Sequence, residues 1–281
     1  MIDDPYPKDW KDLQAGVCRL FNEIGLSAEI EKVLNTPRGE VEVDVYAVDE
    51  VSVDKIQYIV ECKNWSTAIP KTVVHAFTTV MHETGANLGF IVSQKGLQSG
   101  AVAYTDSTNI RGLTYLELQQ RYMPVWWERY FCPHLGDAAD VLMDYVEPFN
   151  GTRNEKLNTM TDKQVVEYHT LANKHGHLGA TLSFFNMGRY RNLRENPESM
   201  GTLLKVPETV EDFRERMLRK VCTYYEFASA TFRELLDELR TVISAAVQEF
   251  LDLFGENIFD YKRGPAAQAL PVATAAAVQE I

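Results

Sequence analysis

Residues 88–92, Leu-Gly-Phe-Ile-Val, form a short and continuously apolar run. A strand of this type is buried on both faces, so the sheet that contains it must be covered by helices on both sides. The run lies between two helical patterns, one that opens at Pro70 and ends at Gly85 and one over residues 100–105, and a further strand is expected near residues 113–115. This alternation of strands and helices predicts an α/β core with crossover connections.

The segment before Pro70 predicts one helix and three strands. A helix is expected from Asp9, a candidate N-cap, to a stop at Gly25, because apolar residues recur between them at helical spacing: Leu13, Val17, Leu20, Phe21 and Ile24. Residues 27–33, 39–48 and 56–63 then show strand-like alternation or β-branched content, which predicts an antiparallel meander. The expected order over the first half of the chain is α, β, β, β, α, β, α, β.

The second half is dominated by helical patterns over residues 161–176, 207–227 and 230–255. The last of these carries an apolar stripe that needs a partner surface: Phe232, Leu235, Leu236, Leu239, Val242, Ile243, Ala246, Phe250 and Phe254. We therefore expect an α/β domain over residues 1–125, a junction over 126–160 around the Trp126-Trp127 pair, a helical domain over 161–262 and an Ala-rich tail over 263–281.

Charge and composition restrict the function. The 281 residues include 40 Asp and Glu against 28 Lys and Arg, a formal net charge of −12. Residues 1–125 hold 17 acidic and 11 basic residues, a net of −6, so any positive surface in this half must be local. No apolar stretch approaches the roughly 20 residues of a membrane span, and the acidic N-terminus lacks an apolar signal core, which predicts a soluble, cytoplasmic protein without membrane contact.

Two of the expected strands carry a group of charged residues. Strand alternation over residues 41–46 puts Val43 and Val45 on one face and Asp44 on the other. In the strand that ends near Lys63, Glu61 and Lys63 lie on the same side, opposite Val60 and Cys62. If the two strands pair as a hairpin, Asp44, Glu61 and Lys63 can converge.

Two carboxylates and a lysine match the requirements of phosphodiester hydrolysis. Carboxylate oxygens suit Mg²⁺, which prefers hard oxygen ligands and keeps several waters. A divalent cation there would neutralise phosphate charge and supply hydroxide from a bound water. A fixed ammonium beside the scissile phosphate would stabilise the extra negative charge of the transition state. This reasoning predicts a metal-dependent nuclease.

The spacing of Asp44 and Glu61-Cys62-Lys63, at the end of an apolar strand, resembles the PD-(D/E)xK nuclease superfamily and specifically its Mrr-type restriction endonucleases. The segments over 85–86, 89–93 and 96–101 are similar to the strand and helix that follow the catalytic lysine in that family, so the resemblance spans about residues 9–120. It implies a restriction-endonuclease-like α/β core, a mixed central sheet flanked by helices, followed here by the mainly α-helical region.

By that resemblance, Asp44 and Glu61 would bind Mg²⁺ or Mn²⁺ with the Cys62 backbone carbonyl as a further ligand, and Lys63 would be the catalytic lysine. The substrate would be DNA, and the role a prokaryotic defence by restriction. Family members often carry a Glu in the first helix, where this chain has Gln14, a neutral side chain and a poorer ligand for a hard cation. This departure leaves open a catalytically degenerate domain that binds DNA or serves in assembly.

Further candidate residues surround this group. Gln14, Glu42, Asn64 and Lys71 are expected to support the site or to contact phosphate. The most basic and aromatic stretch of the chain predicts either nucleic-acid contact or a solvated loop, with Arg189, Tyr190, Arg191 and Arg194 as its candidate residues. His169, His175 and His177 have no neighbouring cysteines, and the last two are expected to cap a helix end rather than to bind zinc.

Three functions are consistent with these patterns. The first is a Mg²⁺-dependent endodeoxyribonuclease, in which the helical domain serves recognition, regulation or dimerisation. Cutting both strands of a duplex generally needs two active sites, so a homodimer or higher homo-oligomer built on the C-terminal helices is expected. The second is the degenerate module, which Gln14 and the negative net charge favour. The third is a nuclease that acts on RNA or on DNA junctions.

Overall fold

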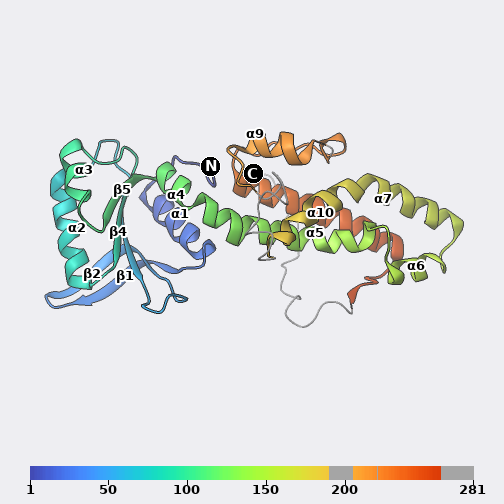
Figure 1. The fold of residues 1–281 in the computed structure, drawn as a ribbon, viewed down its shortest axis with the longest axis horizontal. Coiled ribbons are helices and arrows are strands. Elements are labelled where there is room, and N and C mark those ends of the chain that lie inside the picture. Colours follow the sequence, from blue (N-terminus) through green and yellow to red (C-terminus); the bar gives the residue numbers. More distant parts are fainter. Residues whose placement is uncertain (190–204, 220, 261–281) are drawn as a thin grey trace, which may run out of the picture.

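The computed structural model describes residues 1–189, 205–219 and 221–260. The molecule is elongated, with an α/β unit at one end and a bundle of helices at the other (Figure 1). The α/β unit has the predicted order of elements: α1 Trp10–Glu23, β1 Ser27–Thr36, β2 Gly39–Val48, β3 Gln57–Lys63, α2 Lys71–Thr84, β4 Leu88–Ser93, α3 Ser99–Thr105 and β5 Ile110–Thr114.

The five strands form one mixed sheet in the order β1-β2-β3-β4-β5. The first three strands are antiparallel neighbours, whereas β3, β4 and β5 run parallel to each other. The parallel pairs are joined through α2 and α3, as crossover connections require. The predicted antiparallel meander and α/β core are thus both present in a single sheet.

Helices cover the sheet on both faces. Side chains of α1 and α4 (Tyr115–Trp126) contribute to the core on one face, and those of α2 and α3 to the core on the other. Strand β4 supplies both: Phe90 and Val92 point into the first core and Ile91 into the second. The continuously apolar run therefore is buried on both faces, as its composition predicted.

Local signals define the ends of the first two helices. The Asp9 side chain accepts a hydrogen bond from the Asp12 backbone N–H and caps α1. Gly25, with φ of 93°, follows this helix, and Gly85, with φ of 70°, ends α2. Both glycines adopt the left-handed conformation that favours residues without a Cβ. The predicted starts and stops are confirmed.

A long helical rod connects the two ends of the molecule. Helix α4 continues through a π-helical turn, η1 Trp127–Phe131, into α5 Cys132–Val146. Trp126, Trp127 and Phe131 are almost fully buried, so the aromatic pair lies in a hydrophobic junction as expected. Residues 126–160 are helical for most of their length, because η1 and α5 are followed by α6 Gly151–Leu157.

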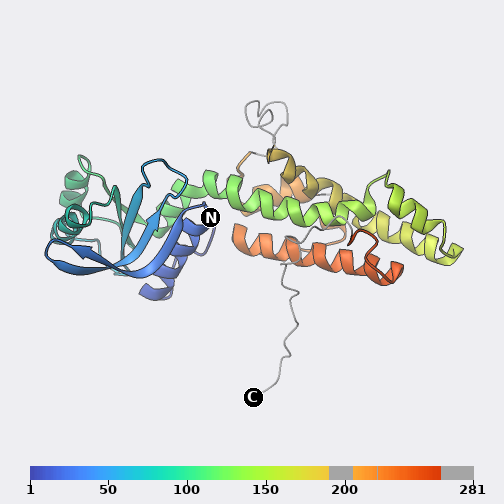
Figure 2. The same cartoon turned by 90° about the horizontal axis from the view of Figure 1, so that it is seen from below.

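The remaining helices assemble around this rod. Helix α7 Asp162–Ser183 and the short η2 Phe184–Arg189 pack against α5, and α10 Phe232–Phe254 runs beside α5 and α7 (Figure 2). The apolar stripe of α10 is buried against these helices within the same chain: Leu235, Leu236, Leu239, Ile243, Ala246, Phe250 and Phe254. The partner surface that the stripe needs is therefore intramolecular.

Two expectations for the helical region are wrong. Where the structure describes residues 207–227, that is 207–219 and 221–227, their helical elements are the short α9 Val210–Phe213, a π turn, η5 Arg214–Leu218, and a 3₁₀ turn, η6 Val221–Thr223. Five of the seven residues over 221–227 are β-branched or aromatic and favour a helix weakly. His177 lies inside α7 and does not cap a helix end, and neither does His175. His175 also lies inside α7, is 1% exposed, and its Nε2 lies 3.1 Å from Glu249 Oε2 while its Nδ1 contacts the Tyr225 hydroxyl.

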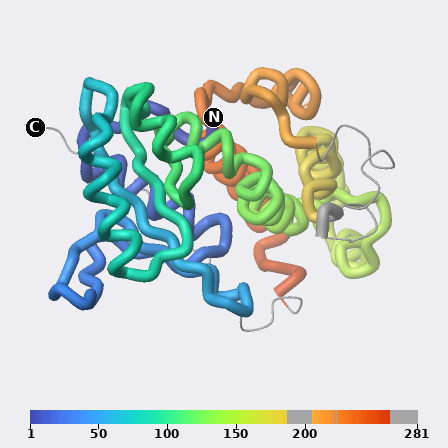
Figure 3. The backbone as a smooth tube through the Cα atoms, turned by 60° about the vertical axis from the view of Figure 1, so that its left-hand side comes forward, coloured from blue at the N-terminus to red at the C-terminus, as the bar shows by residue number. Residues whose placement is uncertain are grey.

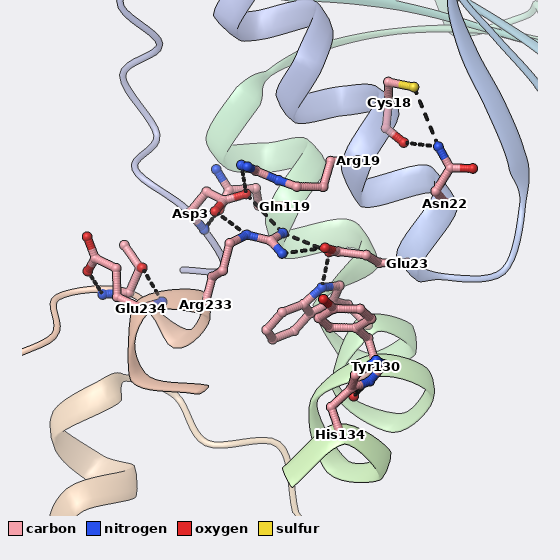
Figure 4. A network of polar contacts seen from close by, with 12 residues as sticks. Asp3, Cys18, Arg19, Asn22, Glu23, Gln119, Tyr130, His134, Arg233 and Glu234 are labelled. Atoms are coloured by element: carbon pink, nitrogen blue, oxygen red, sulfur yellow. Dashed lines mark hydrogen bonds and ion pairs between the residues drawn. The ribbon is translucent and has the colours of Figure 1, made fainter. Parts of the chain in front are cut away.

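The N-terminal residues attach the α/β unit to the helical bundle. The Phe232 and Arg233 backbone N–H groups donate to the carbonyls of Met1 and Ile2, so the chain begins beside the start of α10 (Figure 3). The Arg233 guanidinium then lies between the carboxylates of Asp3 and Glu23 (Figure 4). None of the helices described here is long and apolar enough to cross a membrane.

Candidate active site

Asp44 lies where the ladder between β2 and β3 ends. The last paired residues toward that end are Val45 and Val60. Beyond them, the Asp44 side chain takes the place of a backbone acceptor, since its Oδ2 accepts a 2.6 Å hydrogen bond from the Cys62 N–H. The carboxylate is therefore held against the end of β3 by the main chain of that strand.

The strand alternation changes at Asp44. Val43 belongs to the core beneath α2, whereas Val45 belongs to the core beneath α1, so the expectation that these two residues share one face is wrong. On the neighbouring strand, Glu31 has φ of 52°, and it does not form a ladder pair with Asp44 although the residues on either side of it are paired. Both strands thus depart from the regular pleat at this level, as strands do at bulge-like irregularities.

Gln14 holds the other oxygen of Asp44. Its side-chain amide donates a 2.9 Å hydrogen bond to Asp44 Oδ1, and the residue is 3% exposed. The neighbouring residues Leu13 and Val17 are buried in the core, so α1 is fixed against the sheet with Gln14 facing Asp44. The structure therefore brings together Gln14 and Asp44, which are 30 residues apart in the sequence.

Glu61 and Lys63 lie at the end of β3 and form an ion pair with each other. Their side chains are about equally exposed, 28% and 26%, so both reach solvent. Burial acts to lower the pKa of the Lys63 ammonium, but the hydrogen bond and charge of Glu61, with a contribution from the charge of Asp44, raise this pKa above its ordinary value. Lys63 is therefore a cation at neutral pH, with both acids near enough to act on it.

Cys62 points the opposite way from Glu61 and Lys63. The residue is 5% exposed and belongs to the core beneath α1, as the sequence alternation predicted. Burial, together with the charges of Asp44 and Glu61, raises the pKa of its thiol well above the ordinary value. The thiol is thus a neutral core group, which leaves the backbone carbonyl as the only part of Cys62 suited to a hard cation.

The donor set fits a small divalent cation with waters in its coordination shell. Within the described residues, no group of three or more His, Cys, Asp and Glu side chains is placed to hold a metal ion. Mg²⁺ is commonly bound by one or two carboxylates, with water and substrate phosphate completing its octahedron. Two adjacent strands here supply two carboxylates, and the position on α1 that could have added a third carries the Gln14 amide.

The other predicted residues lie at varying distances from this group. Asn64 follows Lys63 and accepts a 2.7 Å hydrogen bond from the side chain of Gln94. The Lys71 ammonium lies 5.6 Å from the centre of the Tyr104 ring rather than against Asp44 or Glu61. Glu42 is exposed on β2. Arg189 ends η2, and Tyr190, Arg191 and Arg194 lie outside the described residues.

Sequence reasoning missed the loop after β4. Gln94 reaches Asn64 because β3 and β4 are parallel and end at the same level, with Lys63 opposite Ser93. The available signal was the crossover connection itself, since the carboxyl ends of parallel strands meet at one edge of a sheet. The loop that follows β4 should therefore have been placed beside the loop that follows Lys63.

The α/β unit has a restriction-endonuclease-like fold, a mixed sheet with helices on both faces. One carboxylate, Asp44, lies where the antiparallel strands β2 and β3 separate, and the Glu61-Lys63 pair lies on β3. The family model described as a restriction endonuclease, Mrr_cat, matches residues 8–122. These residues are therefore similar to the catalytic domain of Mrr-type restriction endonucleases. Nucleases of this kind generally use divalent cations.

A comparison with curated proteins found no match. Among solved structures, the crystal structure of a protein of unknown function, AF1548, is similar at 14% sequence identity and a TM-score of 0.34, over 84% of this chain and 100% of that one. A likeness at this TM-score carries no argument about fold or function.

Proposed function

We propose that this protein is a metal-dependent endodeoxyribonuclease in which Asp44 and Glu61 bind Mg²⁺ and Lys63 acts on the scissile phosphate. The observation that carries the proposal is the position of Asp44, which bridges the separated ends of β2 and β3 beside the Glu61-Lys63 pair. The family match over residues 8–122 supports the same chemistry. Mn²⁺ would substitute for Mg²⁺, because it also accepts oxygen ligands in octahedral geometry.

The residues of the site have separate tasks in this proposal. Cys62 N–H and the Gln14 amide each donate to one oxygen of Asp44, which fixes the carboxylate before any ligand binds. The second lone pair of each oxygen stays available to a cation. When bound, Mg²⁺ would supply a water of lowered pKa and stabilise the departing oxygen. Lys63, held as a cation by Glu61, would stabilise the charge that builds up on the phosphate.

Plasmid cleavage tests this assignment. We expect the wild type to nick or linearise supercoiled plasmid with Mg²⁺ or Mn²⁺ but not with EDTA. Asp44→Ala should abolish cleavage, and Lys63→Ala should reduce the rate by about 10²–10³-fold, as the removal of one charge-stabilising group does. Glu40→Ala changes an exposed acid on the same strand and should cut like the wild type.

Metal binding gives a second and independent readout. Calorimetric titration with Mn²⁺ should show binding to the wild type and to Lys63→Ala but not to Asp44→Ala. Metal-dependent cutting that survives in Asp44→Ala would refute the assignment of the site.

A catalytically degenerate DNA-binding or assembly module is the second candidate. Gln14 favours it, because an amide occupies the position where a third carboxylate would strengthen metal binding. The Glu61-Lys63 ion pair also favours it, because that pair neutralises a prospective ligand. A folded wild type that binds DNA but neither cuts plasmid nor binds Mn²⁺ would establish this alternative.

The biological role and assembly belong to the same proposal. A restriction role in prokaryotic defence is consistent with the family match, and the helical region, residues 161–262 in our division, would then serve recognition, regulation or dimerisation. The α10 stripe is used within the chain, so a homodimer is proposed only because cutting both strands needs two sites. Sedimentation of the full chain with and without DNA tests it, and a monomer that makes only single-strand nicks would contradict it.

A further inference from the structure

The loops that follow β3 and β4 form one continuous surface beside the candidate site. Both strands end at the same level, and the Asn64-Gln94 hydrogen bond joins the first residues beyond them. Further along, the Ile69 N–H donates to the Gly96 carbonyl at 2.9 Å and the Gln98 N–H donates to the Ile69 carbonyl at 3.0 Å. We refer to residues 64–71 and 94–98 together as the carboxyl-edge surface.

Trp65 is the large aromatic side chain of this surface. The backbone N–H of Trp65 donates to the Lys63 carbonyl at 2.7 Å. This tight turn fixes the backbone of Trp65 directly beyond the proposed catalytic lysine. The residue is 43% exposed, whereas Trp126 and Trp127 are 0% and 2% exposed. A tryptophan whose backbone is fixed beside the site and whose side chain is partly open to solvent is available to stack on a ligand there.

The carboxyl-edge surface is positive within an acidic domain. Residues 64–71 and 94–98 contain two lysines, Lys71 and Lys95, and no acid, whereas the preceding Lys63 is paired with Glu61. Glu83 lies near the opposite end of α2 and pairs with Arg38 at 3.1 Å, so it does not offset these lysines. Lys95 is exposed and adjoins Gln94, just as Trp65 adjoins Asn64 on the other side of the hydrogen bond.

We propose that the carboxyl-edge surface binds an unpaired stretch of DNA, with a nucleobase stacked on Trp65 and the backbone phosphate on Lys95. The inference rests on the proposed nuclease function and specifies its substrate as DNA with a single-stranded segment at the cleavage position. In a continuous duplex the base faces are stacked on each other and cannot meet an aromatic ring, whereas an unpaired base exposes its face.

The charge balance also favours an unpaired strand. Duplex binding draws most of its affinity from phosphate contacts, and a domain with a net charge of −6 offers few of them. Stacking on an aromatic side chain adds affinity that does not depend on a wide basic surface. One tryptophan beside a few lysines therefore matches a single strand better than a duplex.

Binding without cleavage tests the inference. Fluorescence anisotropy of the full chain in EDTA would compare labelled oligothymidylate, a duplex of the same length and oligouridylate. We expect the wild type to bind oligothymidylate most tightly. Trp65→Ala should weaken that binding about tenfold, within the range measured for base stacking, while Trp65→Phe should retain most of it. Lys95→Ala should lower the salt dependence of binding by about 0.7 in the log-log slope, as expected for one lost phosphate contact.

Two control variants lie outside the α/β unit. Phe149→Ala removes an aromatic side chain that is 89% exposed, and Lys163→Ala removes an exposed lysine. Neither should change the binding of oligothymidylate. If Trp65→Ala binds like the wild type, or if the wild type prefers the duplex, the inference is wrong. Tighter binding of oligouridylate would overturn the choice of DNA.

The outcomes separate this inference from the proposed function. Unchanged oligothymidylate binding in Trp65→Ala, together with metal-dependent cutting that Lys63→Ala loses, would leave the nuclease assignment intact and overturn only the stacking role. A stacking defect in Trp65→Ala, in a wild type that never cuts DNA with any divalent cation, would support a single-strand-binding surface and overturn the nuclease assignment.

Discussion

Arg233, near the start of α10, joins this helix to the N-terminal segment and to α1. Its removal should be among the most destabilising single changes in the protein. Its guanidinium donates to Asp3 Oδ1 at 2.6 Å, to Asp3 Oδ2 at 3.2 Å and to Glu23 Oε2 at 2.7 Å, with a further contact to Glu23 Oε1. The side chains of Arg233, Asp3 and Glu23 are only 13%, 12% and 8% exposed. Arg233→Met keeps most of the aliphatic stem but leaves two buried carboxylates without their shared cation.

The expected loss follows from that burial. Breaking a buried ion pair by removing one partner costs about 3–5 kcal/mol, because the remaining charge is uncompensated. The Trp126 indole N–H still donates to Glu23 at 2.6 Å, and Arg19 and the Tyr115 hydroxyl still donate to Asp3 at 3.0 Å and 3.4 Å. Each acid therefore keeps at least one donor, and the loss should fall toward about 3 kcal/mol. A domain of ordinary stability, about 5–15 kcal/mol, would lose a large part of it.

Urea unfolding followed by circular dichroism measures this loss. Arg216→Met is the matched control, since Arg216 pairs with Asp212 on the surface, where such pairs contribute about 0–1 kcal/mol. Replacing Asp3 by Asn and Glu23 by Gln in the Arg233→Met background should recover part of the lost stability, because the uncompensated charges are then gone. A loss of less than about 1 kcal/mol in Arg233→Met would refute the reasoning.

Three further predictions concern the site, the buried histidine and a close contact. Gln14→Glu should place a second acid against Asp44 and lower the free energy of unfolding by about 1–3 kcal/mol in EDTA, with a smaller loss in Mn²⁺. Equal losses in EDTA and in Mn²⁺ would contradict a metal site. Burial lowers the pKa of His175 below its ordinary value of 6.5, although Glu249 opposes the shift. The free energy of unfolding should therefore keep its full value above pH 6.5, fall below pH 6.5 by at most about 1.4 kcal/mol per pH unit, and level off beneath the lowered pKa. In urea titrations at several pH values, His175→Gln should flatten this profile. An unchanged profile would contradict the role of His175. Gly112→Ala should cost about 1–3 kcal/mol, because its Cβ would lie 2.2 Å from Leu97 Cγ, whereas Gly100→Ala meets nothing within 4 Å and should be neutral or stabilising; equal melting temperatures would refute the comparison.

The sequence predicted the α/β unit well because its signals are local. The N-cap at Asp9, the stop at Gly85 and the apolar run over 88–92 each specify the conformation of their own segment, and the structure confirms all three. The convergence of strands β2 and β3 also followed from sequence, since a hairpin brings neighbouring strands together. Local patterns were sufficient wherever the structure is regular.

The same patterns failed where tertiary contacts decide the conformation. Alternation predicted that Val43 and Val45 share one face, opposite Asp44, but these two valines belong to the cores on opposite faces of the sheet. The neighbouring strand is also irregular at this level, where Glu31 has a positive φ. The apolar stripe of α10 indicated a partner without saying that the partner is α5 and α7. Asp3 and Arg233 are separated by 230 residues, and no periodicity connects them.

Helix α1 links the candidate site to the helical region. Gln14, which holds Asp44, lies nine residues before Glu23, which holds Arg233, so the two contacts are about 14 Å apart along one rigid helix. Tyr115, at the start of the rod that leads into the bundle, packs so closely on Gly16 that a Cβ there would lie 2.4 Å from its hydroxyl. The bundle therefore contacts α1 both at its end and, through the rod, next to Gln14. If α10 moves relative to the sheet, either the hydrogen bonds of Arg233 break or α1 moves with α10. In the second case the Gln14 amide, which donates to Asp44, moves as well.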